Sequence, residues 1–307
     1  MSRLRCIAGA VAVTILLTAA SDARPLVVPF DFSRHEVGLN VRVHGTPLYM
    51  FLDTGVTPSA IDPARAKSLG LKIDFAGGGE GSGAGDAQHV MAYPTSIDDL
   101  VIGGRHFGAV EALTADQKAI SGAYGRPVDG TLGHSFLAGK VVLIDYAART
   151  LTISDSEADM ASQRAVCRSA WNTPLKSFKG DIIPIVDLGI GKAVLPASID
   201  TGSDGTVELF KRALDEPSVK AALVEAGTTR ETGARGGYTA KVYKLNAPIR
   251  LGPFVLPAGE RVTLNSDAGS AETRLVNIGD RLLAEIHVKL LLDYRGNRIA
   301  FLGDCAR

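Results

Sequence analysis

The sequence has little that points to metal, redox or nucleic-acid chemistry. Of its 307 residues, 3 are cysteine, 1 is tryptophan and 6 are histidine. No two histidines have the spacing of metal ligands, and His35-Glu36 lacks the second histidine of an HExxH motif. Lysine plus arginine equals aspartate plus glutamate at 33 each, so no basic surface for nucleic acid is expected. We expect no metal, no cofactor and no nucleic-acid partner.

Motifs for nucleotide binding and for serine or cysteine nucleophiles are also missing. The segment 77–85 is rich in glycine, but it does not match the nucleotide-binding motif G-x-G-x-x-G in any register. The other nucleotide-binding motif, GxxxxGK[ST], does not occur. There is no GxSxG, and Cys167 has no setting that indicates a thiol nucleophile. The glycine-rich segment is better interpreted as a mobile hairpin tip, with a plain flexible loop as the alternative.

The one long apolar run is short for a membrane span and lies at the N-terminus. Residues 1–5 carry positive charge, residues 6–20 are apolar and small, and small residues follow at 21–23. This pattern predicts a signal peptide over residues 1–23, cut near Ala23, with a retained anchor as the alternative. The chain is then exported, periplasmic or secreted, with no membrane contact after cleavage.

Cysteine usage is compatible with export. Cys6 leaves with the signal peptide, so Cys167 and Cys305 are the only pair in the mature chain. An oxidising compartment permits a disulfide between them. Spacing alone does not establish that the two residues approach each other, so a bridge and inert burial both remain open.

What the sequence does contain is a repeat. Asp53-Thr54-Gly55 follows an apolar stretch, and so does Asp200-Thr201-Gly202-Ser203. An apolar element that ends in glycine follows each motif. The distance along the chain from the first motif to Gly133 is nearly the same as the distance from the second motif to Gly279. Asp145 and Asp293 lie at matching positions further along the two copies. The residues around each are typical of a hairpin turn, so we do not interpret the two aspartates as a second acidic pair. Such a repeat predicts two similar lobes, over residues 24–160 and 161–307.

The pattern of elements is mostly β. Residues 36–44 alternate apolar and polar side chains, as a half-buried strand does. Asp62-Pro63 is a typical helix start. Small polar residues dominate 155–172, which is the candidate boundary, and the second lobe carries a longer helical insert over about 207–225. A second glycine-rich tip is expected at 233–238.

These residues resemble the pepsin-like and retropepsin-like aspartic peptidases, over nearly all of the mature chain. The resemblance implies a bilobal pepsin-like acid protease fold, with two related β-barrel-like lobes and a cleft between them, in a chain that suffices as a monomer. It implies that Asp53 and Asp200 are catalytic, that Thr54 and Thr201 hydrogen-bond across the lobe interface, and that Gly55 and Gly202 let the turns pass beneath the carboxylates. A flap formed by Ser82, Gly83, Ala84 and Gly85 would close over bound peptide.

The chemistry explains why two carboxyl groups are needed. Amide hydrolysis requires a base that activates water and an acid that protonates the departing nitrogen, and two carboxyl groups sharing a proton supply both. Ser203 offers Asp200 a hydroxyl partner that Val56 does not offer Asp53. The prediction is an aspartic endopeptidase acting on peptides or proteins. The alternative is a non-catalytic peptide-binding protein that retains the fold.

Overall fold

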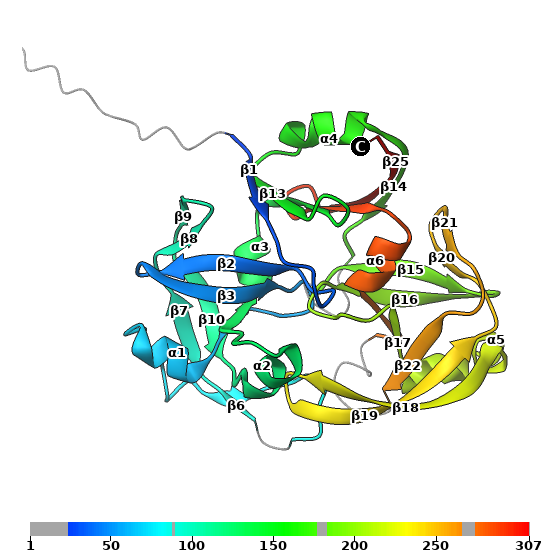
Figure 1. The fold of residues 1–307 in the computed structure, drawn as a ribbon, viewed down its shortest axis with the longest axis horizontal. Helices are drawn as coiled ribbons and strands as arrows, with labels where there is room; N and C mark the ends of the chain where they lie inside the picture. The colour runs from blue at the N-terminus through cyan, green and yellow to red at the C-terminus, as the bar shows by residue number, and fades with distance from the viewer. Residues whose placement is uncertain (1–23, 88–89, 177–182, 266–273, 307) are drawn as a thin grey trace, which may run out of the picture.

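The computed structural model describes residues 24–306 except 88–89, 177–182 and 266–273. The predicted signal peptide therefore lies outside the described residues. Strands form most of the elements, so the prediction of a mostly β protein is confirmed (Figure 1). Of the helices in the described ranges, none is both long enough and apolar enough to cross a membrane.

The first large sheet holds the first Asp-Thr-Gly motif. Its strand β2 buries Leu39, Val41 and Val43 and exposes Asn40 and Arg42, as the alternation predicts. In order across the sheet, the strands are β7 (Pro94–Ile97), β10 (Val110–Thr114), β4 (Ser59–Ile61), β11 (Gly130–Leu132), β3 (Thr46–Leu52), β2 (Gly38–Val43), β8 (Leu100–Ile102) and β9 (Arg105–Phe107). A separate pair, β5 (Gly79–Glu80) and β6 (Met91–Ala92), forms a hairpin beside it.

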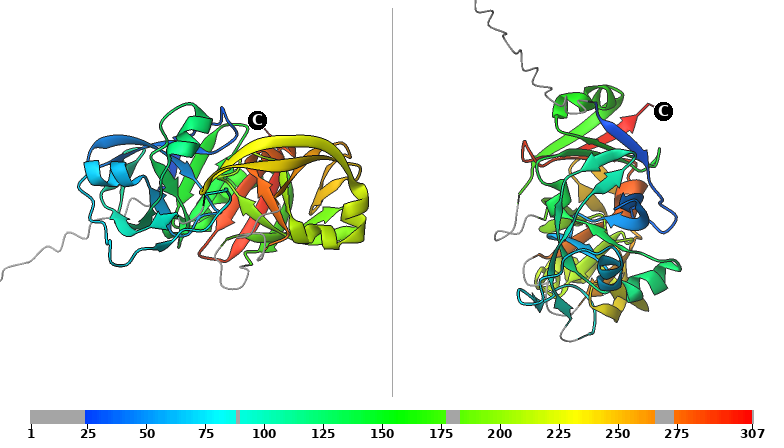
Figure 2. Two further views of the ribbon diagram at one scale, coloured as in Figure 1. Left: turned by 90° about the horizontal axis from the view of Figure 1, so that it is seen from below. Right: turned by 90° about the vertical axis from the view of Figure 1, so that its left-hand side faces the viewer.

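The second large sheet repeats the central topology of the first. Strand β11 runs parallel to β3 and antiparallel to β4, and β23 runs parallel to β16 and antiparallel to β17. In order, the strands are β18 (Leu223–Gly233), β19 (Gly236–Leu245), β22 (Arg261–Asn265), β17 (Val207–Phe210), β23 (Val276–Gly279), β16 (Ala193–Asp200), β15 (Ile185–Ile190), β20 (Ile249–Leu251) and β21 (Phe254–Leu256). The two sheets lie at opposite ends of the molecule (Figure 2).

A third sheet joins the two halves of the chain. Strands β12 and β24 pair antiparallel at its centre, with Leu143 opposite Leu291. In order, its strands are β1 (Leu26–Pro29), β13 (Thr150–Ser154), β12 (Val141–Asp145), β24 (Lys289–Asp293), β25 (Arg298–Cys305) and β14 (Cys167–Pro174). Asp145 and Asp293 accept hydrogen bonds from turn N–H groups of Ala148 and Gly296, so their predicted turn roles are confirmed.

The helices are short. They are α1 (Pro63–Ser68), α2 (Lys118–Tyr124), α3 (His134–Leu137), α4 (Ala161–Ala165), α5 (Pro217–Ala222) and α6 (Asp280–Glu285), with 3-10 turns at Glu157–Met160 and Lys211–Asp215. The predicted start of α1 is confirmed, because Asp62 caps it by accepting from Ala64 and Arg65 N–H and Pro63 occupies the first turn.

One local prediction is wrong. Residues 207–210 of the expected helical insert form β17, because buried Val207 and Leu209 pair with strands on both sides. Helical structure is confined to the two short segments between 211 and 222, and β18 follows. Within the candidate boundary at 155–172, β14 begins at Cys167, because β25 supplies a partner that the local sequence does not reveal.

Candidate active site

Asp53 follows β3 directly and is held by the first sheet. Its N–H donates to Leu132 O of the parallel strand β11 at 3.0 Å. Leu52 and Leu132, which precede the turn and face each other in the pair, are fully buried. The chain then turns, and Gly55 N–H donates to Asp53 Oδ1 at 2.7 Å. The residue is 8% exposed, so its carboxyl group is largely shielded from water.

Asp200 occupies the same place in the second sheet. It is the last residue of β16 and pairs with Gly279 of the parallel strand β23. Ile199 and Ile278, the neighbours on the two strands, are fully buried. Gly202 N–H donates to Asp200 Oδ1 at 3.1 Å. The two turns therefore present their carboxyl groups in the same way.

The structure brings the two motifs into direct contact. A methyl group added to Gly55 would lie 2.6 Å from Asp200 Oδ1, and one added to Gly202 would lie 2.4 Å from Asp53 Oδ2. Each glycine thus leaves the space that the carboxyl group of the opposite motif fills, and any larger residue would collide with it. The Asp200 carboxylate also acts on Asp53 electrostatically.

Thr54 and Thr201 join the two motifs by four hydrogen bonds. Thr54 Oγ1 donates to Ile199 O at 2.7 Å and accepts from Thr201 N–H at 3.1 Å. Thr201 Oγ1 donates to Leu52 O at 2.7 Å and accepts from Thr54 N–H at 3.1 Å. Both threonines are buried, and a fully satisfied buried network of this kind is rigid.

The electrostatics of the pair favour one shared proton. Burial raises the pKa of Asp53 well above its ordinary value, and the Asp200 carboxylate raises it further, while Gly55 N–H opposes them. Two carboxyl groups in such contact do not ionise together easily, so they titrate as one unit. A unit that keeps one proton near neutral pH can act as acid and base at once.

Asn277 completes the site and was missed in the sequence. It lies on β23 and its Nδ2 donates to Asp200 Oδ2 at 2.8 Å. Ser203 was the expected hydroxyl partner, whereas the side-chain donor that the structure gives Asp200 is Asn277. The position of Asn277 in the downstream apolar-Gly element was the available signal, since a buried amide is unusual in an otherwise apolar strand end.

The predicted flap residues lie at the end of the β5–β6 hairpin, against the second glycine-rich tip. Ala84 O accepts from Arg235 N–H at 2.8 Å, and Ala87 N–H donates to Arg235 O at 3.0 Å. The Arg235 side chain adds a bond from Nε to Ala87 O at 2.9 Å. These backbone bonds connect two tips that belong to different halves of the chain.

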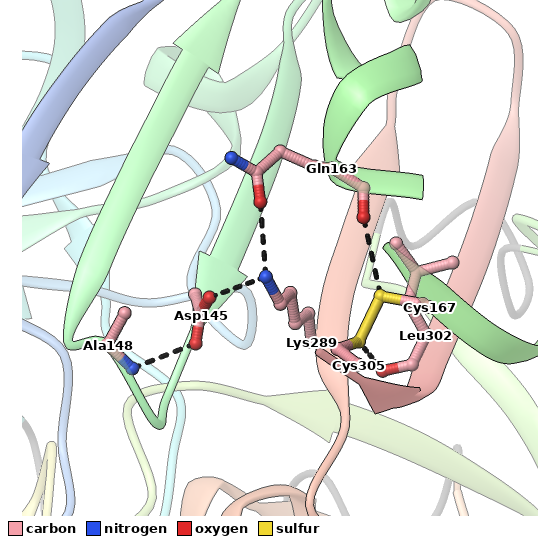
Figure 3. Close-up of a disulfide and its surroundings, with 7 residues drawn as sticks. All are labelled: Asp145, Ala148, Gln163, Cys167, Lys289, Leu302 and Cys305. Carbon is pink, nitrogen blue, oxygen red and sulfur yellow. Dashed lines mark hydrogen bonds and ion pairs between the residues drawn. A yellow bond between two sulfur atoms is a disulfide. The ribbon is translucent and has the colours of Figure 1, made fainter. Parts of the chain in front are cut away.

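Cys167 and Cys305 lie away from this site, in the sheet that joins the two halves. They face each other on β14 and β25 and form a disulfide. Nearby, Lys289 Nζ of β24 contacts Asp145 Oδ2 of β12 at 2.8 Å and Gln163 Oε1 at 3.1 Å (Figure 3). Within the described ranges, no group of three or more His, Cys, Asp or Glu side chains could hold a metal ion.

Comparison with known proteins assigns part of the chain to a family. Residues 39–136 match the family model described as Aspartyl protease. This segment includes Asp53-Thr54-Gly55 and Gly133, and it ends well before Asp200. No curated protein matches the chain. Residues 39–136 are therefore an aspartyl protease segment, and peptides are the substrates that this family implies.

Proposed function

We propose that this chain is an aspartic endopeptidase in which Asp53 and Asp200 form one catalytic dyad. The observation that carries the proposal is the mutual fit of the two motifs. Each glycine turn packs against the opposite carboxyl group, and the two threonines make four hydrogen bonds across the contact, two with each other and two with the carbonyl oxygens of Ile199 and Leu52. A protein that only binds peptide has no need to hold two ionisable groups together at a desolvation cost.

The proposed reaction uses one carboxyl group as base and the other as acid. The base takes a proton from water, whose oxygen forms a bond to the carbonyl carbon, while the acid protonates the carbonyl oxygen. The amide bond then breaks as its nitrogen takes a proton from the dyad. The buried threonine network keeps both carboxyl groups in place, which supplies the positioning that such a reaction needs.

The proposed architecture is bilobal, with one lobe over residues 24–160 and the other over 161–307. The matching order and direction of β3, β11, β4 and of β16, β23, β17 supports it. Substrate would lie in the cleft between the lobes, under Ser82–Gly85 and the tip formed by Ala234 and Arg235. Because both halves of the site lie in one chain, we propose a monomer.

We also propose that the protein is exported and works in the periplasm or outside the cell. The signal-like segment 1–23 is the sequence basis for this. The Cys167–Cys305 disulfide supports it, because such bonds persist in oxidising compartments.

The test is cleavage of an unstructured protein substrate between about pH 3 and 8, the range in which a carboxyl pair holds one proton. We expect Asp53→Asn and Asp200→Asn each to lower kcat/KM by about 10³-fold or more. Asp98→Asn, which neutralises an exposed carboxylate outside the site, should leave kcat/KM unchanged. Cleavage that survives in either dyad variant would refute a shared dyad. A folded parent that cleaves nothing would favour a peptide-binding protein.

A further inference from the structure

The two aspartates receive different sets of hydrogen bonds. Each accepts one N–H from its own glycine turn, Gly55 for Asp53 and Gly202 for Asp200. Asp200 accepts a second one, from Asn277 Nδ2 at 2.8 Å. An N–H donor stabilises a carboxylate more than it stabilises the neutral acid. The two copies of the repeat therefore give their aspartates unequal hydrogen bonding.

The amide of Asn277 is oriented by a neighbour that is itself fixed. Ser198, on the adjacent strand β16, is fully buried, and its hydroxyl lies within hydrogen-bond distance of Asn277 Oδ1 and of Val276 O. With Oδ1 accepting from Ser198, the Nδ2 group faces Asp200. Asn277 is 4% exposed, so water does not compete for its donor.

Among the described residues of the first half, none gives Asp53 an equivalent donor. Thr131 holds the register position opposite Phe51 that Asn277 holds opposite Ser198. Thr131 Oγ1 is buried and makes no hydrogen bond with the described residues. Val56, in the turn after Asp53, has no polar side chain. The extra donor is thus a property of the Asp200 side alone.

Other titratable and charged groups lie near the pair. Asp280 at the start of α6 acts on both aspartates, Glu208 of β17 acts on Asp200, and Tyr294 after β24 lies within the field of Asp53. Arg274, before β23, favours an ionised Asp53. Its effect is the smallest of those acting on Asp53, behind burial and the Asp200 carboxylate. Where they are ionised, Asp280 and Glu208 disfavour an ionised Asp200, and Arg274 favours an ionised Asp53, so these groups act against Asn277. Burial raises the pKa of both Asp280 and Glu208, which reduces the charge that they carry, and we take the direct hydrogen bond from Asn277 as the larger effect.

We propose that Asn277 is a positioning residue that holds the shared proton on Asp53, by stabilising the ionised form of Asp200. This inference depends on the proposed peptidase function. It gives the carboxyl groups distinct starting roles. Asp200 takes the proton of the attacking water, and Asp53 gives its proton to the carbonyl oxygen. When the C–N bond breaks, the nitrogen takes the proton from Asp200, and the hydroxyl proton of the intermediate returns to Asp53.

The kinetic test compares pH profiles of kcat/KM for the parent, Asn277→Leu and Asn277→Ala. The acidic limb reports the pKa at which the doubly protonated pair loses its first proton, from Asp200. Without the donor, the ionised form of Asp200 is less stable, so this pKa and the acidic limb should rise by about one to two pH units. The alkaline limb should stay in place, because Asp200 is ionised both before and after the second proton leaves. Thr131→Val, the matched change in the first sheet, should move neither limb.

A merely structural role would lower kcat at all pH values and shift neither limb, and this result in folded variants would overturn the proposal. A second measurement does not require activity. With ¹³C-labelled aspartate carboxyls, the proton of the singly protonated pair should appear on Asp53 in the parent, assigned with the Asp→Asn variants. Asn277→Ala should reduce the shift difference between the two carboxyl carbons. An unchanged difference would refute the role of Asn277, whereas a parent with this asymmetry but no cleavage would refute only the peptidase function.

Discussion

Glu36 illustrates, at the scale of one residue, how costly a buried carboxyl group is without a partner. It precedes β2, and its Oε2 is buried without a hydrogen bond to the described residues. Burial, followed by the Asp204 carboxylate, raises the pKa of Glu36 from 4.5 to about 8. The unfolded chain releases this proton near pH 4.5, but the folded chain keeps it to about pH 8. The folded state is therefore penalised progressively between these values, and fully above pH 8.

Glu36→Gln should remove this penalty. We expect the variant to match the parent in free energy of unfolding at pH 4, and to exceed it by roughly 2 kcal/mol at pH 9, since the carboxyl is partly solvated. Urea denaturation at both pH values measures this. Glu111→Gln, at an exposed glutamate, is the control and should show no such pH-dependent gain. Equal stability of the Glu36 variant and the parent at pH 9 would contradict the prediction.

The sequence predicted some residues of the site and not others. The Asp-Thr-Gly motifs were visible because their contacts are made by adjacent residues in a fixed turn. Asn277 and Glu36 were not assigned roles, because their surroundings depend on strands and charges far away in the sequence. Ser203 was expected to offer Asp200 a hydroxyl for the same reason, because the amide on β23 that reaches Asp200 is distant in the sequence.

At the scale of elements, the contact between the two tips depends on glycine. Gly85 has φ +132, and a Cβ there would lie 2.3 Å from the carbonyl carbon of Arg235. Gly79, in β5 of the same hairpin, has nothing within 4 Å of an added Cβ. The hairpin thus contains one glycine required by the contact and one that is not.

Gly85→Ala should separate the tips. Strain and the backbone clash should speed amide hydrogen exchange at Ala87 and Arg235 by about tenfold, because both N–H groups bond across the contact. Exchange measured by mass spectrometry or NMR gives this rate. Gly79→Ala should leave it unchanged. Equal exchange in the parent and in Gly85→Ala would show that the tips tolerate the added methyl group.

Prediction of elements succeeded where local chemistry decides the structure. Asp62 and Pro63 start α1 by capping and by a fixed backbone angle, and both effects act within one turn. Residues 207–210 were assigned to a helix, but strands β22 and β23 on either side determine their conformation. A strand with two buried partners cannot be distinguished from a helix by a short apolar run alone.

At the scale of the whole molecule, the shared sheet connects the two halves. Strands β12 and β24 come from the repeated sequence and pair with each other, a contact that the repeat itself did not reveal. The sequence predicted two similar units, because self-similarity is visible along the chain. It could not predict their pairing, because the register between them is set only in three dimensions.

The disulfide should stabilise this sheet. Cys167 and Cys305 are 138 residues apart, so their bond closes most of the second half of the chain into a loop. We expect Cys167→Ser with Cys305→Ser to lower the free energy of unfolding by about 2 to 5 kcal/mol. Denaturant titration measures this, and added reductant should destabilise the parent but not the double variant. A parent insensitive to reductant and equal in stability to the variant would contradict the prediction.

The bonds between Thr54 and Thr201 also bear on how the protein is made. Their partners are separated by 147 residues in the chain, and Asp200 needs β23, which is synthesised much later than β3. A growing chain therefore has no complete dyad until nearly all of it has been synthesised. If the dyad acts as proposed, a chain still being synthesised is inactive, and cleavage can begin only once β23 has been made and has folded against β16.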